Sequence, residues 1–368
     1  MKIHILQENL LKTLSRVGRI ISSRTQLPVL QNILITATKD SVTFAASNME
    51  MSMLVRVNAK TDKEGSVCVS GKLLTELVTS LPHETVVLED KEGALFVSTT
   101  KTHASLSETP PQEFPQLKIN GDGDKIVMDP DVVVGAIGSV LYASSTDEGR
   151  PVLTGVKMET TEKETTFVAT DGYRLSLKKV TFEKKNPANM IVPSRALGEI
   201  IKTLSEEKKK EPVVFEKTTD GQLLLTVGDT GVISRLIDGD YPDYARIIPK
   251  NHTTKGTADK TELLLAVKSA SIFARDNANI VKFHLSGSGI TVSANTPQIG
   301  QNTVDVDASV DGEDAEIAFN SRFLLEFLNN FPEDEVLFEM TGSLNPGVFK
   351  STKDKSFLHI IMPVRVQS

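Results

Sequence analysis

Apolar residues recur along this chain with helical spacing in some segments and with strand-like grouping between them. Leu10, Leu14, Val17 and Ile21 fall four, three and four positions apart, which makes one apolar stripe of an α-helix. Short apolar runs bounded by turn residues follow and predict strands over 33–36, 42–45 and 51–57. A second helix is predicted over 71–81, and further strands over 85–89 and 95–99.

The same order of elements returns twice. The spacing of Val133, Ile137 and Val140 predicts a second opening helix, and the segment 261–267 begins a third. The later helices of these copies are predicted over 194–204 and 321–331. Two helices and several hairpin-like strands per copy favour an α+β fold with antiparallel sheets rather than a parallel α/β sheet.

Direct sequence likeness supports this reading as a repeat. The segment 71–77 reads GKLLTEL and recurs as SRALGEI at 194–200 and as SRFLLEF at 321–327, at steps of 123 and 127 residues. The segments 28–33 and 44–48 are echoed 123 positions later at 151–156 and 167–171. Such a long period indicates whole domains rather than solenoid units. We therefore predict three copies of one domain, over 1–120, 127–247 and 248–368, joined by turn-rich linkers near 120–124 and 249–257.

Composition places the chain among ordinary globular proteins. Of its 368 residues, 39% are apolar and 24% are charged, and no run of 18 apolar residues occurs. The N-terminus lacks the apolar core of a signal peptide, so we expect a cytoplasmic protein. The single cysteine, Cys68, excludes an internal disulfide and lies in a strand-like run, where a buried small side chain is expected.

The charge pattern leaves two readings open. A net charge of −7 is not that of a domain that grips nucleic acid. Either DNA is not a partner, or positive charge is confined to one face. Lys12, Arg16 and Arg19 share one face of the first predicted helix, which keeps the second reading open.

Motifs for chemistry are missing from the sequence. No phosphate-binding loop, dinucleotide fingerprint, zinc-protease motif, cysteine cluster or nucleophile elbow occurs, and the six histidines have no metal-ligand spacing. We therefore expect no catalytic residue, no metal and no cofactor.

Two segments stand out. Residues 170–175, TDGYRL, combine an Asp-Gly turn with a tyrosine and an arginine, which fits a plain hairpin turn as well as a functional site. Residues 359–366 form an apolar C-terminal segment, where most chains fray. That segment fits a final strand docked in a sheet, or the wall of a surface groove with Met362 as its adaptable part.

Three segments together resemble the bacterial DNA polymerase III beta subunit, the sliding clamp family. They are the turn at 170–175, residues 238–244 (DGDYPDY) and residues 362–365 (MPVR), and the likeness runs the full length of the chain. The segments 22–24 and 27–30 are also similar to that family. The resemblance implies a head-to-tail homodimeric ring of six domains that encircles duplex DNA, with helices lining the hole and sheets forming the outer wall. Such a ring tethers the replicative polymerase for processive synthesis during DNA replication and has no chemistry of its own.

The same resemblance implies functional residues. Arg24 and Arg150 look like family positions that touch DNA, and the helical bases expected to face the hole are Lys12, Arg16, Arg19, Arg195 and Lys202, with Lys72 and Arg322 as weaker candidates. Such phosphate contacts are sequence-independent and salt-sensitive. The alternative for each base is a solvated surface residue. The dimer contact implied by the family joins the first domain of one chain to the third of the other, with Ile272 and Phe273 opposite Leu106.

A groove between the second and third domains is also implied. It takes short linear peptides, typically with glutamine and apolar or aromatic residues, from polymerases, the clamp loader and repair proteins. Its expected walls are Leu153, Thr170, Gly172, Tyr173, Arg174, Leu175, Pro242, Arg246, Ile247, Asn320, Phe323, Leu344, Ile360, Met362, Pro363, Val364 and Arg365.

Two other functions compete with the clamp. An enzyme built from tandem α+β domains would use Asp171 and Arg174 in a cleft, and its turnover would be lost in Asp171→Asn. A scaffold would oligomerise without meeting DNA. Retention on circular DNA that is lost when the circle is cut distinguishes the clamp from both.

Overall fold

A computed structural model describes residues 1–22, 27–117, 123–181, 188–207, 210–218, 220–297 and 300–365. The chain forms two compact units. The first unit comprises Met1–Asp131 and Gly198–Leu236, and the second comprises Val132–Leu197 and Ile237–Ser368. Both α3 (Pro130–Leu141) and α4 (Ser194–Glu206) contain a boundary between the units.

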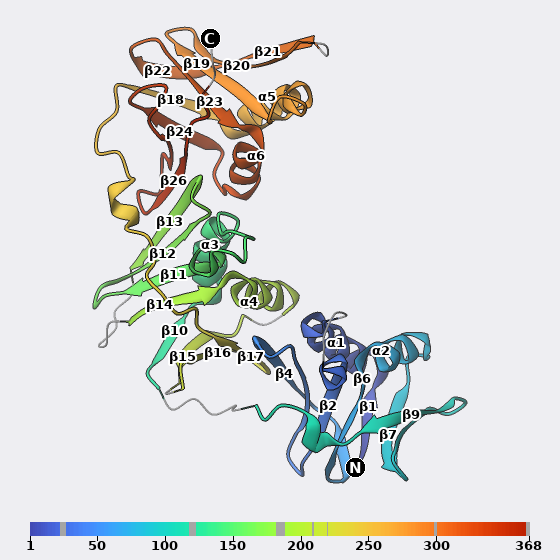
Figure 1. Ribbon diagram of the computed structural model, residues 1–368. Helices are drawn as coiled ribbons and strands as arrows, with labels where there is room; N and C mark the ends of the chain where they lie inside the picture. The colour runs from blue at the N-terminus through green and yellow to red at the C-terminus, as the bar shows by residue number, and fades with distance from the viewer. Residues whose placement is uncertain are drawn as a thin grey trace. The chain divides into compact units, whose positions relative to one another are not determined.

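The described residues of the first unit build one antiparallel sheet of 13 strands. Helices α1 (Gln7–Val17) and α2 (Gly71–Ser80) pack side by side against this sheet (Figure 1). In sheet order the strands are β10 (Lys125–Met128), β15 (Val213–Lys217), β16 (Gln222–Val227), β17 (Thr230–Arg235), β4 (Met51–Val57), β3 (Val42–Ser47), β2 (Asn32–Ala37), β6 (Gly65–Ser70), β9 (His103–Thr109), β8 (Ala94–Ser98), β7 (Thr85–Lys91), β1 (Lys2–Leu6) and β5 (Lys60–Lys63).

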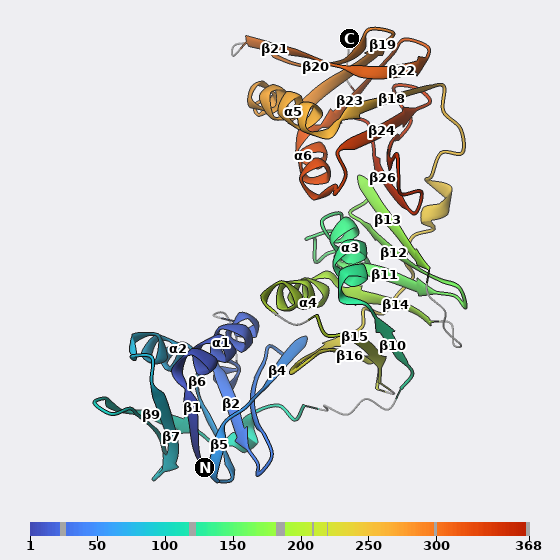
Figure 2. The same cartoon turned by 180° about the vertical axis from the view of Figure 1, so that it is seen from behind.

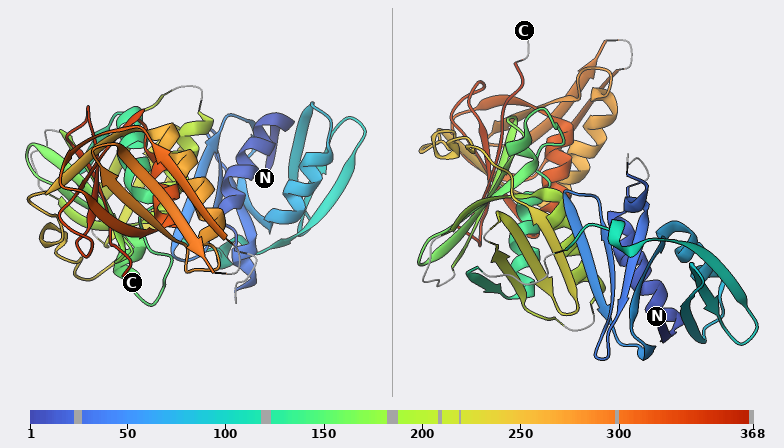
Figure 3. Two further views of the ribbon diagram at one scale, coloured as in Figure 1. Left: turned by 90° about the horizontal axis from the view of Figure 1, so that it is seen from above. Right: turned by 60° about the horizontal axis from the view of Figure 1, so that its bottom comes forward.

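A junction between two sequence copies lies within this sheet. Strand β17 of the second copy pairs with β4 of the first, in antiparallel register from Thr230↔Val55 to Ser234↔Met51. The right-hand view of Figure 3 shows β15–β17, in yellow-green, beside β4, in blue. The sheet thus continues from one copy into the next without an open edge between them.

The described residues of the second unit form a nine-stranded and a four-stranded antiparallel sheet. Helices α5 (Lys260–Ala274) and α6 (Ser321–Asn330) pack together on them, as Figure 2 shows from behind. The larger sheet contains β14 (Ala188–Pro193), β11 (Gly155–Thr160), β12 (Glu164–Thr170), β13 (Arg174–Thr181), β26 (Phe357–Ile361), β25 (Gly347–Ser351), β24 (Glu335–Met340), β18 (Thr254–Asp259) and β22 (Ala308–Gly312). The smaller contains β21 (Gly300–Val306), β20 (Gly289–Thr296), β19 (Ile280–Ser286) and β23 (Ala315–Asn320).

Local sequence accounts for where several helices begin. Ser70, Asp259 and Asn320 precede α2, α5 and α6, and the side chain of each accepts a hydrogen bond from a backbone N–H of the first turn. Such caps satisfy donors that a helix start leaves without an internal partner. The apolar stripe predicted for α1 is buried, with Leu10, Leu14 and Val17 fully inaccessible to solvent.

The core of the third copy is built around phenylalanine rings. Phe283, Phe319 and Phe338 meet edge to face, with ring centroids 5.7 to 6.0 Å apart. Gly347 of β25 allows the close approach, because a Cβ there would lie 2.3 Å from the Phe319 ring. Perpendicular aromatic pairs of this kind add about 1 kcal/mol each beyond the buried area.

The fold confirms the predicted class, because the strand pairs of the described residues are antiparallel and each copy carries two helices. The linker prediction over 249–257 is wrong in its second half, because β18 begins at Thr254. Its alternation of buried and half-buried residues is strand-like but too polar to stand out in the sequence. The strands β1 and β10, ahead of the opening helices, were not predicted; they are only five and four residues long, too short for a clear pattern.

Cys68 lies buried on β6 as predicted. Burial raises the pKa of its thiol to about 11, so the reactive thiolate is disfavoured at neutral pH. Among the described residues, no helix is long and apolar enough to span a membrane. The same residues contain no group of three or more His, Cys, Asp or Glu side chains placed to hold a metal ion.

Candidate functional site

The turn at 170–175 is held by its own side chains. Asp171 Oδ1 accepts hydrogen bonds from the backbone N–H groups of Tyr173 and Arg174, at 2.8 and 3.0 Å. Thr170 Oγ1 accepts one from Gly172 N at 3.0 Å and donates one to the Arg174 carbonyl at 2.6 Å. Gly172 has φ +92°, a conformation that glycine adopts at little cost. The turn therefore presents the next side chain, Tyr173, in a fixed position.

Arg174 anchors this turn to the protein interior. Its side chain is 7% exposed, and its Nε donates to Asp171 Oδ2 at 3.1 Å. Nη2 donates to the Tyr142 carbonyl at 2.7 Å, and Nη1 lies 2.6 Å from Glu326 Oε2 in an ion pair without hydrogen-bond geometry. The guanidinium also stands 4.7 Å from the centroid of the Phe323 ring. Arg174 thus joins β13, α6 and the segment after α3 as a buried, paired charge.

These contacts leave no free general acid or base in the turn. Both Asp171 oxygens are engaged, one by two backbone N–H groups and the other by Arg174. The enzyme hypothesis needed Asp171 and Arg174 to meet a substrate in a cleft, whereas the two residues stabilise the turn instead.

Apolar side chains gather on the outside of the turn. Tyr173 is 60% exposed and stacks on Phe323, with ring centroids 6.4 Å apart. Met362, 37% exposed, follows β26, and its N–H donates to the Tyr173 carbonyl at 2.8 Å. Tyr173, Phe323 and Met362 are called the Tyr173 surface below. Exposed aromatic and methionine side chains next to a fixed turn are typical of protein-binding surfaces.

The C-terminal segment is docked rather than frayed. Strand β26 pairs with β13 from Arg174↔Ile361 to Lys178↔Phe357, and Val364 N donates to the Ala318 carbonyl at 2.8 Å. Of the two readings of residues 359–366, the docked strand is therefore present, and it carries Met362 to the Tyr173 surface.

The other predicted groove residues differ in their burial and contacts. Leu153, Thr170, Leu175 and Ile360 are buried, and Leu175 and Ile360 belong to one apolar cluster under the segment 241–248. Ile247 and Leu344 are exposed by 39% and 62%, and Arg246 pairs with Asp243 at 2.7 Å. Asn320 caps α6, Gly172 and Pro242 are exposed, and Pro363 and Val364 are half-buried. Arg365 lies apart from the Tyr173 surface, at a cavity of about 670 Å³ that also borders Lys282 and Asn295.

A histidine that the sequence did not single out lies behind the site. His359 on β26 is fully buried, stacks on Phe327 with centroids 4.8 Å apart, and has its Nδ1 2.6 Å from Ser176 Oγ. Burial, with Arg174 nearby, holds the pKa of His359 well below its usual value, so the ring is neutral. Tyr142, whose hydroxyl lies 3.2 Å from the same nitrogen, has a pKa raised by burial.

Arg16 and Arg19 lie in an ion-pair network. Arg16 is 5% exposed; its Nε donates to Glu206 Oε2 at 3.0 Å and its Nη1 to Glu207 Oε1 at 2.5 Å. Arg19 pairs with Glu199 and Glu206 at 2.6 and 2.7 Å. The face predicted to meet DNA is instead matched by carboxylates on and after α4. The sequence could not pair charges that lie about 190 positions apart.

The remaining basic candidates are more accessible. Lys12 is 51% exposed and lies 3.9 Å from Glu207, and both Arg195 and Lys202 are exposed on α4. Lys72 and Arg322 are exposed on α2 and α6. Arg150 pairs with Asp147 at 3.0 Å and borders Gly172, so it lies next to the turn at 170–175. Arg24 is outside the described residues.

The predicted dimer residues lie beside sheet edges. Among the described residues, β21 pairs only with β20, and residues 103–107 of β9 pair only with β8. Leu106 is half-buried on β9, Ile272 is 55% exposed on α5, and Phe273 is half-buried against the core of the third copy. Open strand edges are ready to pair with another chain.

Comparison with known proteins gives a consistent result over the whole chain. Family models for the N-terminal, central and C-terminal domains of the DNA polymerase III beta subunit match residues 1–118, 127–243 and 245–365. The beta sliding clamp of Staphylococcus aureus (strain Mu50) is 31% identical, with 99% of each chain covered, and that of Staphylococcus epidermidis is 30% identical.

Solved structures agree with these matches. The DNA polymerase sliding clamp of Bacillus subtilis superposes with a TM-score of 0.93 at 29% identity, covering 100% of both chains. The beta subunit of DNA polymerase from Streptococcus pyogenes shares the fold with a TM-score of 0.94 at 22% identity, again over 100% of both chains.

Proposed function

The chain belongs to the DNA polymerase III beta subunit family, and from this membership we propose that it is a sliding clamp that holds a replicative polymerase on duplex DNA. The observation that carries the proposal is the succession of three clamp domains along the chain, in the order in which the family has them. The family is a non-catalytic processivity factor, so the protein supplies enclosure and attachment rather than chemistry. We place it in the cytoplasm, with the DNA on which such a factor acts.

We propose that two chains close into a head-to-tail ring, with the first domain of one chain against the third domain of the other. The open edges of β9 and β21 support this arrangement, because joining them would pair two strands that otherwise expose backbone donors and acceptors. Ile272, Phe273 and Leu106 lie on the elements that such a contact would bring together. A heterologous contact of this kind forms a closed ring when its rotation closes.

For DNA, the proposed contacts are Lys12, Arg150, Arg195 and Lys202 together with Arg24. Arg16 and Arg19, also expected to face DNA, already pair with Glu199, Glu206 and Glu207. A net charge of −7 is compatible with this role, because topological enclosure replaces strong binding. Few phosphate contacts give weak attraction that salt screens readily, which permits sliding.

For partners, we propose that the Tyr173 surface and its neighbours receive short linear peptides from the polymerase, the clamp loader and repair proteins. Support comes from the exposure of Tyr173, Ile247, Leu344 and Met362 on one compact unit. Arg174 contributes by fixing the turn rather than by meeting the peptide, because it is already enclosed by Asp171, Glu326 and Phe323.

A topological experiment tests the function. The protein is loaded by a clamp loader on a nicked circular plasmid, and bound protein is counted after gel filtration in about 0.2 M salt, where phosphate contacts are weak. We expect the protein to stay with the circle and to leave within minutes once a restriction enzyme linearises it. Equal retention on circular and linear DNA would contradict a clamp and support ordinary electrostatic binding.

A further inference from the structure

The turn at 47–52, in the first copy, repeats three side-chain-to-backbone hydrogen bonds of the turn at 170–175. Asn48 Oδ1 accepts hydrogen bonds from the N–H groups two and three residues on, at 3.1 and 2.8 Å. Asp171 Oδ1 does the same in the second copy, at 2.8 and 3.0 Å. Ser47 Oγ accepts from the N–H two residues on at 3.2 Å, as Thr170 Oγ1 does at 3.0 Å.

Each turn also accepts one backbone hydrogen bond from the end of a neighbouring strand, β17 in one case and β26 in the other. Arg235, at the end of β17, donates its N–H to the Glu50 carbonyl at 3.2 Å. Met362, after β26, donates its N–H to the Tyr173 carbonyl at 2.8 Å. Thus β17 lies on β4 as β26 lies on β13, and the position of Glu50 corresponds to that of Tyr173.

Met49 stands where the other turn has Gly172. Its φ is +76°, in the left-handed region where Gly172 has +92°. A methionine in this region costs about 1 kcal/mol or more, and strain of this kind gathers at functional sites. The side chain of Met49 is 51% exposed, so burial does not account for the choice of residue.

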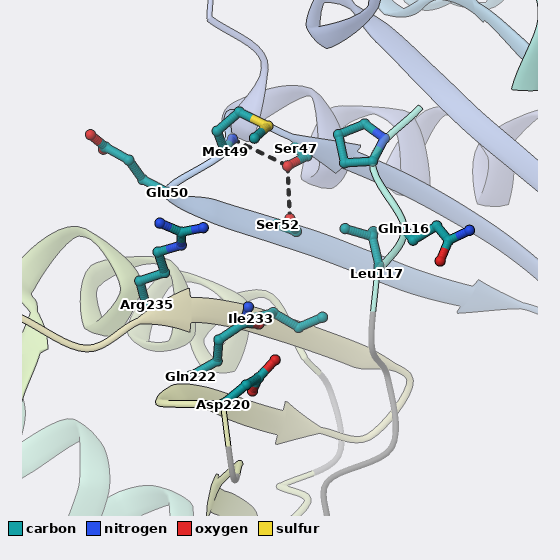
Figure 4. A pocket seen from close by; sticks show the side chains of 11 residues that line it. Ser47, Met49, Glu50, Ser52, Gln116, Leu117, Asp220, Gln222, Ile233 and Arg235 are labelled. Carbon is teal, nitrogen blue, oxygen red and sulfur yellow. Dashed lines mark hydrogen bonds between the residues drawn. The ribbon is translucent and has the colours of Figure 1, made fainter. Parts of the chain in front are cut away.

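A cavity opens at this turn, within the first unit. It holds about 150 Å³ and is bordered by the turn, the end of β17 and the segment 115–117 (Figure 4). Its apolar lining consists of Met49, Pro115, Leu117 and Ile233. A cavity of about this volume accommodates a group of the size of benzene, so one aliphatic side chain fits. This cavity is called the Met49 pocket.

Charge distinguishes the Met49 pocket from the Tyr173 surface. Glu50, Asp220 and Arg235 all border it, giving two carboxylates against one guanidinium. Figure 4 shows Glu50 and Arg235 on the same side of the pocket, with Asp220 on another strand connection. The turn at 170–175 presents Tyr173, whereas the turn at 47–52 presents the carboxylate of Glu50 at the corresponding position. Because a carboxylate attracts positive charge, the Met49 pocket favours a basic ligand.

We propose that the Met49 pocket is a second peptide-docking site, which takes an extended segment of a partner protein with one aliphatic residue flanked by lysine or arginine. The aliphatic side chain enters between Met49, Leu117 and Ile233, and the basic side chain pairs with Glu50. The proposal rests on the proposed function to the extent that the Tyr173 surface, its repeat counterpart, is itself a peptide site. One chain then holds two partners of different chemistry at once.

Methionine methyl groups report on the two sites separately. The full-length protein is labelled with ¹³C at the methionine methyls, and the Met49 and Met362 signals are assigned with Met49→Leu and Met362→Leu. Two blocked peptides are titrated: Gly-Lys-Leu-Lys-Gly, and a peptide with one glutamine followed by leucine and phenylalanine. We expect the lysine peptide to shift the Met49 signal saturably and to leave the Met362 signal in place.

The charge-reversal variant Glu50→Lys tests the role of charge, and because Glu50 is exposed we expect this variant to fold normally. We expect the lysine peptide to bind this variant at least about tenfold more weakly, the loss of roughly one charge-assisted contact. Glu64→Lys, the same charge change at an exposed position outside the pocket, is expected to change the affinity by less than about twofold.

The outcomes separate this proposal from the proposed function. An unmoved Met49 signal, or an affinity that Glu50→Lys and Glu64→Lys reduce equally, would overturn the second site. A glutamine peptide that fails to move Met362 would count against the Tyr173 surface alone, because the lysine peptide and Met49 are read independently.

Discussion

At the scale of single residues, Arg16 is a basic side chain whose charge is used in an internal ion-pair network. Its guanidinium is almost removed from water and lies against Glu206, Glu207 and Thr230. A basic stripe on an amphipathic helix thus indicates a nucleic-acid contact or an internal ion-pair network equally well. Only the location of the opposite charges distinguishes the two, and that location depends on tertiary structure.

We predict that Arg16→Met lowers the free energy of unfolding of the first unit by about 2 kcal/mol. Removing the buried guanidinium leaves Glu206 paired with Arg19 at 2.7 Å and Glu207 at 3.9 Å from Lys12. These remaining partners and the partial exposure of both carboxylates place the loss below that of a fully buried pair. Urea denaturation measures the change. Lys12→Met is the matched control, expected to cost less than about 0.5 kcal/mol because Lys12 is half exposed. Equal losses in the two variants would show that Arg16 has no special structural role.

His359 makes stability depend on pH. Its pKa in the folded protein lies well below 6.5, whereas in the unfolded chain the pKa returns to about 6.5. Between these two pKa values the unfolded chain binds more protons, so stability rises with pH there. As pH falls below about 6.5, stability is lost at up to about 1.4 kcal/mol per pH unit.

We predict that His359→Phe, which keeps a ring to stack on Phe327, reduces this dependence on pH between 6.5 and 5. Chemical denaturation at a series of pH values measures the slope. His284→Gln, at an exposed histidine on β19, should leave the slope as it is. A slope that survives in His359→Phe would assign the acid sensitivity to other groups.

At the scale of elements, the turn at 170–175 and β26 act together. The turn fixes Tyr173, and β26 brings Met362 beside it through one backbone hydrogen bond. We predict that Tyr173→Ala weakens binding of a glutamine-containing partner peptide by at least about tenfold, since exposed aromatic anchors carry most of the energy of such contacts. Fluorescence anisotropy of a labelled peptide measures the loss.

Val134→Ala provides the control for that measurement. Val134 is an apolar residue of α3, 39% exposed in the same unit and outside the Tyr173 surface. We expect its peptide affinity to match that of the unaltered protein. If the two variants lose affinity alike, the peptide binds elsewhere.

The sequence predicted these elements better than their contacts. Helices α1, α2, α4 and α6 and most of the first-copy strands lie where apolar spacing indicated. The spacing reports burial within one element, and it says nothing about partners far along the chain. The burial of Arg174 against Glu326 and the Tyr142 carbonyl and the neutral state of His359 both depend on such partners. The Met49 pocket could have been predicted from the sequence, because the repeat aligns 44–48 with 167–171. The turn at 47–52 was not singled out because it carries no aromatic residue.

At the scale of the whole molecule, the proposed ring contact joins β21, which pairs only with β20 among the described residues, to residues 103–107 of β9, which pair only with β8. A ring uses both edges, whereas a lone chain exposes them. Because Phe273 also packs into the core of its own copy, replacing it would disturb the fold as well as the contact. Ile272 is more than half exposed and tests the contact more cleanly.

We predict that Ile272→Ala shifts the protein toward monomers at micromolar concentration, and that Ile272→Ala with Phe273→Ala yields monomers. Loss of an interfacial apolar side chain costs about 1 to 2 kcal/mol per contact, and a two-fold ring contains two such contacts. Sedimentation velocity across a dilution series measures the change. Tyr173→Ala, which alters the peptide surface alone, is expected to sediment as a dimer throughout. If the double variant sediments as a dimer with unchanged concentration dependence, the ring contact does not involve Ile272 and Phe273. The open edges of β9 and β21 would then no longer support the proposed contact.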